Sequence, residues 1–503
     1  MKKLLLTFFL AGIFTCSFAQ TPAGPSYQSL AVKLAHGEIG SSARFKAMGG
    51  AQLSLGADLS SISGNPAGLG FYRSSDLSIT PEYYNTNSKN NWFNSSNKRN
   101  DNQFGLASIG GVFSQTFFDY RGKEKDKGFI NLNMGIGYHK TQNFNRSFQL
   151  NGTNPQSSMS QYFAESANAD LDNNRYLPNL LDSVAYFHAF IMDFDTVING
   201  TDTSLRFIPV SNGGNQQLQN MNIGGSQGEW NFSFGTNYGH KLFLGASLAF
   251  TSSNYNYTSD FTELGIEDTT YGLNSFSIHQ EYDLTGSGVH LKVGAIYRPT
   301  DFIRLGFTGQ TATYTDISEQ FITRFSADFE TGEDYYQNRN ITYLFNYGLT
   351  TPGKIAGGAA FFFGKKGLIS ADVEFINYSK TEFTSDLNNV FFSSINNDLI
   401  TDLQNVMNVR LGAELNVNFI QLRGGFAYYP SPVKPGAIAV NRDKMIYSAG
   451  AGFNFERFYL DMGLQYRTTE SLFAPYVLSE ISTPSTLVSS STINSFVTIG
   501  TRF

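Results

Sequence analysis

The sequence predicts an all-β membrane protein, an antiparallel transmembrane β-barrel of about 14 strands with a small N-terminal plug in its lumen. Hydrophobic and polar residues alternate with period two from about residue 76 to the end of the chain. Short and long connections alternate between these segments. The composition, with 15% aromatic residues, 49 glycines and 15% charged residues, suits a wall with an apolar outer band, aromatic girdles and tight turns.

Residues 1–19 are predicted to be a cleaved signal peptide. Lys2 and Lys3 give a basic start, residues 4–14 form an apolar run, and Ser17-Phe18-Ala19 is a small-x-small cleavage site. Beyond this signal, no apolar run approaches the roughly 18 to 20 residues that a membrane helix needs. We therefore expect strands to make any membrane crossing.

Cysteine content and charge exclude several functions. Cys16 is the single cysteine, and a lipoprotein signal would need a small residue before it, whereas Thr15 follows bulky Phe14. Cleavage after Ala19 then leaves a mature chain without thiols, which excludes disulfides and zinc–thiolate sites. The net charge of −6 falls by two, to −8, when Lys2 and Lys3 are removed, so nothing attracts nucleic acid.

The alternation locates the strands. In 129–140 the apolar side chains of Ile130, Leu132, Met134, Ile136 and Tyr138 alternate with polar or small ones, as lipid-facing and lumen-facing residues do in a barrel. We expect strands near 75–84, 103–115, 128–142, 228–238, 241–257, 280–298, 302–316, 344–363, 367–379, 406–416, 419–429, 445–454, 457–468 and 493–503. Pro81 and Pro352 interrupt two of them and predict bulges.

The connections give the topology. The long connections are 85–102, 143–227, 258–279, 317–343, 380–405, 430–444 and 469–492, and they alternate with short turns such as 299–301. Outer-membrane barrels have long outer loops and short periplasmic turns, so both termini are expected in the periplasm. The domains are then a plug at 20–74, with one or two short helices in 27–48, and a barrel at 75–503.

The segment 40–84 contains the turn on which the plug prediction depends. Its centre, Asn65-Pro66-Ala67-Gly68, favours a turn, because Asn can bond its own backbone, Pro fixes φ and Gly allows close approach. Large apolar residues are too few between Gly56 and Gly70 to build a core, so the segment must pack inside something else. An ordinary surface turn before the first strand is the alternative.

With an Asn-Pro-Ala plug followed by a barrel that ends in Phe503, the chain resembles the FadL/TodX family of outer-membrane transporters for hydrophobic compounds. The resemblance also rests on GSGVHLKVGAIYRPTDFIRLGF (286–307), TTPGKIAGGAAFFF (350–363) and RGGFAYYPSPV (423–433). It implies a plugged barrel in the outer membrane of a Gram-negative bacterium that takes up fatty acids or aromatic hydrocarbons. It also implies that the barrel-assembly machinery recognises Phe503.

Strand parity points several charged residues into the lumen, among them the basic candidates Lys292, Arg298, Arg410 and Arg423. Acidic residues occur there in similar number, and buried charges are usually paired, which favours a network that braces wall and plug. The other interpretation is a carboxylate-binding site, because the family resemblance implies basic residues at a fatty-acid headgroup.

The connection 143–227 is too long to lack structure of its own. Within 176–194, Leu177, Leu181, Phe187 and Ile191 share one face at helical spacing, which predicts an amphipathic helix in an extracellular loop. Its apolar face either packs on the barrel mouth or forms a groove that first binds ligand.

Catalysis finds no support in the sequence. The six histidines form no pair or cluster, and no catalytic or nucleotide-binding motif stands in its required context, so we expect neither an enzyme nor a cofactor. The expected function is passive uptake of small hydrophobic molecules by a monomer in contact with outer-membrane lipid. The alternatives are a docking or shuttle barrel in type IX secretion and a structural outer-membrane protein.

Overall fold

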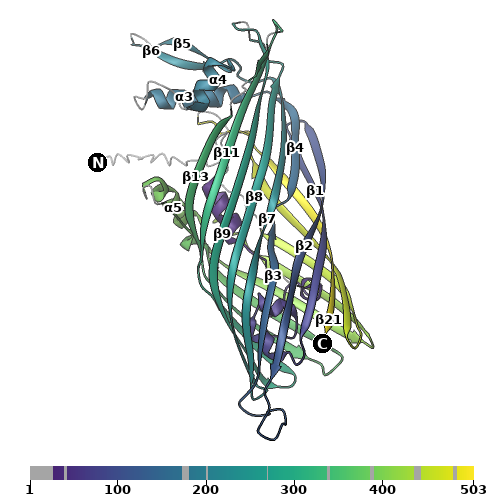
Figure 1. Ribbon diagram of the computed structural model, residues 1–503. Coiled ribbons are helices and arrows are strands. Elements are labelled where there is room, and N and C mark those ends of the chain that lie inside the picture. Colours follow the sequence, from purple (N-terminus) through teal and green to yellow (C-terminus); the bar gives the residue numbers. More distant parts are fainter. Residues whose placement is uncertain are drawn as a thin grey trace, which may run out of the picture.

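The computed structural model describes residues 26–38, 42–172, 180–199, 202–268, 270–332, 334–336, 340–385, 390–435, 443–479 and 484–503. The chain forms a closed antiparallel barrel of 14 strands, which confirms the predicted fold class (Figure 1). The last strand pairs with the first, from Asp76↔Arg502 to Lys89↔Ser489. Four of the barrel strands are each made of two segments in line, namely β3 with β4, β10 with β11, β13 with β14, and β15 with β16.

Each of the fourteen barrel strands overlaps a predicted strand, and several extend further toward the long loops than predicted. The barrel strands are β1 Asp76–Trp92, β2 Ser95–Thr116, β3 Phe129–Asn143 with β4 Arg146–Asn154, β7 Asn215–Tyr238, β8 Leu242–Leu264, β9 Leu273–Thr300, β10 Ile303–Gln310 with β11 Thr313–Phe329, β13 Ile341–Thr351 with β14 Lys354–Phe362, β15 Gly367–Asn377 with β16 Glu382–Thr384, β17 Asn405–Val417, β18 Ile420–Tyr429, β19 Lys444–Asn454, β20 Phe458–Phe473 and β21 Thr486–Arg502. A short strand, β12 Asp334–Tyr336, pairs with β11.

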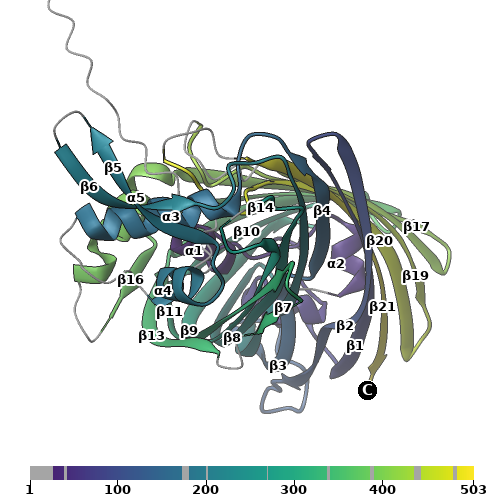
Figure 2. The same ribbon diagram turned by 90° about the horizontal axis from the view of Figure 1, so that it is seen from above.

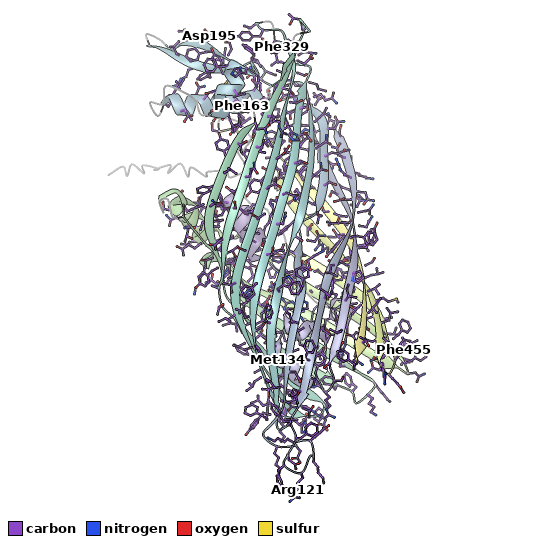
Figure 3. The ribbon with its side chains drawn as sticks, viewed as in Figure 1. Arg121, Met134, Phe163, Asp195, Phe329 and Phe455 are labelled. Carbon is purple, nitrogen blue, oxygen red and sulfur yellow. The ribbon has the colours of Figure 1, made fainter. Side chains whose placement is uncertain are left out.

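Alternation sorts side chains between lipid and lumen. On β3, Met134 is 48% exposed on the outer surface, whereas Asn133 is fully buried inside. The same pattern gives the barrel an outer band of apolar side chains, which includes Ile109, Phe232, Leu248, Leu291, Leu305, Phe375, Leu411 and Leu464. Figure 3 shows Arg121 at one end of the barrel, Asp195 and Phe329 at the other, and Met134 between them.

Several stretches expected as long loops are strands. β1 and β2 continue to a tight turn at Phe93, where φ is +48°, so 85–102 is a hairpin. The connection 143–227 shortens to 155–214, because β4 and β7 extend into it. These extensions are rich in Asn and Ser, and Asn85 Nδ2 donates to Asn102 Oδ1 at 2.6 Å across the hairpin. Because polar residues there replace the apolar alternation, the sequence pattern missed them.

Both strand prolines lie at irregularities, as expected. The pairing register of β1 with β2 shifts between Thr80 and Pro81. Pro352 and Gly353 separate β13 from β14. Opposite them, residues 311–312 separate β10 from β11, so two neighbouring strands bend at the same height.

The ladder between β2 and β3 is incomplete. The two strands pair from Thr116↔Asn131 to Ser108↔His139, and within the described part of these strands no pair joins them beyond that point. From there β2 pairs only with β1, while β3 and β4 pair with β7. The wall therefore has a gap in its hydrogen bonding that starts near Gly105 and Lys140.

The N-terminal segment fills the lumen with α1 Tyr27–Ala35, α2 Ala43–Ala47, η1 Leu59–Ile62 and η2 Pro66–Phe71. Figure 2 shows α1 and α2 inside the ring of strands. At the long-loop end, α3 Met159–Asp172, α4 Leu180–Phe187, β5 Met192–Asn199 and β6 Asp202–Pro209 form an outer subdomain that projects sideways (Figure 1). Helix α5 Val390–Asp402, which follows η3 Tyr378–Lys380 in the chain, lies below this subdomain. Among the described residues, no helix is long and apolar enough to span a membrane.

Candidate functional site

The plug, residues 42–72, is seated against a row of wall glycines, here called the glycine belt: Gly235, Gly245, Gly294 and Gly306 on β7 to β10. The first three are direct partners across neighbouring strands. A Cβ atom on Gly245 would overlap the backbone of Pro66, and one on Gly294 would overlap the side chain of Asn65. Glycine is therefore needed here so that the backbone of the plug can touch the wall.

Asn65 is buried at the start of η2, as the turn chemistry suggested. Its Oδ1 accepts from the backbone N–H of Ala67 at 3.1 Å and caps the helix, with Pro66 in the first turn. Its Nδ2 donates to the carbonyl of Leu53 at 2.7 Å, and the carbonyls of Ala295 and Phe307 in the wall lie at 3.4 and 3.5 Å. Asn65 thus joins two parts of the plug to each other and to the barrel, and Ala67 and Gly68 are buried beside it.

The four basic lumen candidates are already engaged in the structure. Lys292 donates to the carbonyl of Ser63 in the plug. Arg410 is fully buried and pairs with Glu374 at 2.6 Å, and Arg423 pairs with Glu414 at 2.8 Å. Arg298 lies near the end of β9, where its half-buried side chain pairs with Asp301 of the β9–β10 turn.

Other ion pairs fix the plug from its own side. Arg44 of α2 reaches Glu414 at 2.9 Å, and Lys46 reaches Glu82 at 2.6 Å. Just before the plug, Glu38 accepts from Lys444 and Arg467. Burial opposes the ionisation of Glu38, but these two cations hold its pKa well below the ordinary range. The charges therefore form the bracing network that parity suggested, in which the wall and the N-terminal segment each contribute both signs.

The other end of the lumen is apolar. We use the name aromatic chamber for the buried rings that form one apolar cluster with α1: Trp92, Phe148, Tyr255, Tyr257, Tyr282, Phe321, Tyr347, Phe383 and Phe392. Leu30, Val32 and Leu34 of α1 pack against them. The rings contact one another, as Tyr257 stacks on Tyr282 at 5.3 Å and Phe383 on Phe392 at 5.2 Å. The chamber is the largest apolar cluster that the described residues form inside the barrel.

Two small polar cavities lie between the chamber and the plug. The larger, of about 80 Å³, is lined by residues that include His36, Glu229, His290, Lys354 and Glu374. The smaller, of about 30 Å³, is bordered by Lys140, Thr141 and Gln142 beside the gap in the β2–β3 ladder. A benzene-sized guest needs a cavity of roughly 150 Å³. An aromatic molecule could therefore pass only if α1 or the plug moved.

The predicted amphipathic helix is shorter than expected. α4 ends at Phe187, so the expectation of helix to residue 194 was wrong. Phe190 takes φ +49°, and the N–H of Ile191 bonds to the carbonyl of Ala185 at 3.0 Å, a helix-terminating geometry that no Gly or Pro announced. Ile191 and Leu181 are buried in the outer subdomain, Phe187 is 56% exposed, and Leu177 lies outside the described residues.

The arrangement of α4 favours the packing interpretation of its apolar face. Leu181, Val184 and Ile191 belong to one buried cluster with Phe163 of α3 and Phe325 of the barrel rim. The helix thus attaches the outer subdomain to the mouth of the barrel, and its apolar side is covered. An open ligand groove on this face therefore finds no support.

Comparisons with known proteins place this architecture among solved structures. No protein-family model and no curated protein matches the chain. A Pseudomonas aeruginosa FadL homologue is 11% identical and superposes with a TM-score of 0.56 over 92% of this chain and 98% of the homologue. The toluene transporters TodX of P. putida and TbuX of Ralstonia pickettii are 14% and 16% identical, with TM-scores of 0.52 and 0.51 over 92% of this chain and 99% of each of theirs. The chain therefore has the fold of the FadL-type barrels.

Proposed function

We propose that this protein is an outer-membrane channel for the passive uptake of small hydrophobic molecules. The observation that carries the proposal is the aromatic chamber, a section of the lumen that is lined by buried rings. An apolar solute gains free energy when it leaves water for such surroundings, at about 25 cal/mol per Å² of apolar surface buried. Three barrels of the same fold carry names that describe toluene transport or FadL homology.

The chamber is filled by α1, so α1 must make room for a ligand. An isolated helix of nine residues has little stability of its own, and the contacts of α1 with the chamber are mostly apolar side-chain packing. A hydrophobic ligand offers the rings an equivalent surface. Exchange between helix and ligand therefore needs no change in the barrel.

The gap in the β2–β3 ladder is the exit that we infer. It starts where the smaller cavity reaches the wall, at Lys140 and Thr141. An opening sideways would release an apolar solute into the membrane rather than into water, where it is poorly soluble. Phe104, which is 81% exposed on β2, lies on the outer side of this region.

The two ends of the barrel support the orientation that we propose. We place the long loops and the outer subdomain outside the cell, and both termini and the short turns in the periplasm. Phe503 exchanges backbone bonds with Ser75 at the short-turn end, where a C-terminal signal for barrel assembly belongs. An epitope inserted after Ser211 should be labelled on intact cells, and one inserted after Thr300 should not be. The reverse labelling would invert the topology.

The function is tested by uptake of radiolabelled toluene into cells that express the full chain. Leu284, on β9, is buried in the chamber, and Leu291, on the same strand, is 54% exposed on the outer band. Leu284→Asn should lower toluene uptake several-fold, and Leu291→Asn is the matched control that should retain it. Uptake no faster than in cells without the protein, with the barrel correctly assembled, would reject the proposal.

A further inference from the structure

A carboxylate in the wall of the aromatic chamber accepts hydrogen bonds from three phenols. Tyr282 and Tyr347 donate to Oε2 of Glu319 at 2.7 and 2.9 Å, and Tyr27 donates to Oε1 at 2.7 Å. Glu319 lies on β11, and the two tyrosines that share Oε2 come from β9 and β13, the strands that flank β11. The wall thus fixes one oxygen, while the partner of the other comes from the N-terminal helix.

The ring of Tyr27 is held as an aromatic guest would be. Tyr347, Phe383 and Phe392 surround it with centroid distances of 5.7, 5.5 and 5.4 Å, and all three contacts are edge-to-face. This is the geometry that aromatic rings prefer when they pack without covalent constraint. One end of the cage is therefore lined by aromatic rings, and the other end carries the carboxylate of Glu319, which accepts a hydrogen bond.

We propose that this cage is a binding site for phenolic compounds, and that Tyr27 occupies it as an internal mimic of the ligand. The inference rests on the proposed function, because a ligand must enter the chamber to reach Glu319. A phenol that replaces Tyr27 keeps both the ring contacts and the bond to Oε1. A hydrocarbon of the same shape keeps the ring contacts but leaves that half-buried carboxylate oxygen without its donor, which lowers its affinity relative to the phenol.

The exchange is possible because Tyr27 is weakly secured by the rest of its helix. In the first turn of α1, Gln28 donates to Asp402 at 3.2 Å. Other polar contacts lie near the end of the helix, where Lys33 donates to the hydroxyl of Tyr255 at 2.8 Å and Gln142 donates to the carbonyl of Lys33 at 2.6 Å. Withdrawal of the first turn of α1 would vacate the cage and leave Tyr282, Tyr347 and Glu319 in place on their strands.

The test compares 4-ethylphenol with ethylbenzene, which differ by the hydroxyl group alone. Binding is measured by isothermal titration calorimetry on the purified full-length barrel in detergent, after heat-modifiable migration has verified folding. Tyr27→Ala should tighten 4-ethylphenol binding at least tenfold and ethylbenzene binding less. Adding Glu319→Gln to Tyr27→Ala should remove most of the preference for the phenol and leave ethylbenzene binding unchanged.

Gln28→Ala is the matched control, since it loosens the same turn of α1 but leaves the ring of Tyr27 in the cage. It should not produce the phenol preference of Tyr27→Ala. Equal affinity of the Tyr27→Ala barrel for both compounds would overturn the phenol site and leave a hydrocarbon channel intact. Tighter binding of benzyltrimethylammonium than of 4-ethylphenol would overturn it in favour of a cation site. Failure of every variant to bind either aromatic compound would overturn the proposed function as well.

Discussion

The two halves of the lumen hold the N-terminal segment in opposite ways. At the short-turn end, the plug touches wall backbone at the glycine belt and is tied to the wall by directional contacts such as Asn65 with Ala295 and Arg44 with Glu414. At the long-loop end, α1 lies among rings in mostly apolar contact. Figure 2 shows both helices of the segment, α1 and α2, inside the same ring of strands.

The difference indicates which part of the segment a ligand can displace. Buried hydrogen bonds and ion pairs need partners of matching shape and charge, so nothing apolar can substitute for the plug. Apolar packing is not directional, so a hydrophobic molecule can substitute for α1. We therefore expect the plug to stay seated while α1 exchanges, and the following variants test this division in order of decreasing effect.

Gly245→Val should have the largest effect, because a branched side chain there would occupy the place of Pro66 and prevent the plug from seating. We expect the variant to assemble poorly or to expose the plug to added protease. Gly424→Val is the matched control, since a side chain on this strand glycine meets open space. Normal assembly and protease resistance of Gly245→Val would contradict the glycine-belt account.

Arg410→Leu should destabilise the barrel by about 3–5 kcal/mol, because it leaves the carboxylate of Glu374 buried without its cation. The midpoint of thermal unfolding in detergent measures the loss. Combining Arg410→Leu with Glu374→Leu should recover much of the stability, since no unpaired charge remains. A single variant as stable as the parent would remove the pair from the bracing network.

Asn65→Ala should cost roughly 1–3 kcal/mol, the usual loss when buried polar partners are left unsatisfied. This is enough to loosen the plug locally and too little to unfold fourteen paired strands, so the variant should assemble and keep its resistance to SDS. Uptake of toluene should change. Uptake equal to that of the parent would show that the plug turn does not control the passage.

Leu30→Ser should have the smallest effect on the barrel and a clear effect on transport. Leu30 is buried against the chamber and belongs to α1. The substitution weakens apolar contacts of the helix and leaves the wall unchanged, so the unfolding midpoint should match that of the parent while toluene uptake rises. A lower midpoint with unchanged uptake would mean that α1 is a structural part of the barrel.

The sequence predicted the membrane-embedded part of the fold well, because there the lipid imposes alternation on each strand. The prediction failed where the strands extend beyond the lipid toward the long loops. Strand β11 runs to Phe329, yet its outer part was expected as the loop 317–343. In this part apolar side chains such as Phe321 and Phe325 face the lumen and polar ones face outward, the reverse of the pattern in the lipid. Glu319 lies in that stretch, so the carboxylate of the proposed phenol site was hidden by a missed strand.

The candidate site was predictable only where local chemistry specifies it. The turn at Asn65 could be found, because Asn-Pro is a local signal for a helix start. Parity placed Arg410 and Arg423 inside, but their acidic partners lie on neighbouring strands whose register the sequence does not reveal. The rings of the aromatic chamber come from strands and loops far apart in sequence. Only a count of the aromatic residues that strand parity points inward, such as Tyr255 and Tyr282, could have indicated the chamber.

The length of β9 has a consequence for where the chamber stands relative to the membrane. Its 28 residues extend about 90 Å along the strand at ~3.3 Å per residue, whereas the apolar band of an outer-membrane barrel is about 25 Å tall. The outward apolar residues of β9 lie at 289–297 and its chamber residues at 282–284, nearer the long loops. In the orientation that we propose, the aromatic chamber is an apolar compartment that lies above the bilayer, within the hydrated saccharide layer. A dilute hydrophobic solute would then partition into the chamber before it reaches the membrane. At low concentration, the partition coefficient of the solute between water and the chamber would set the rate of its uptake.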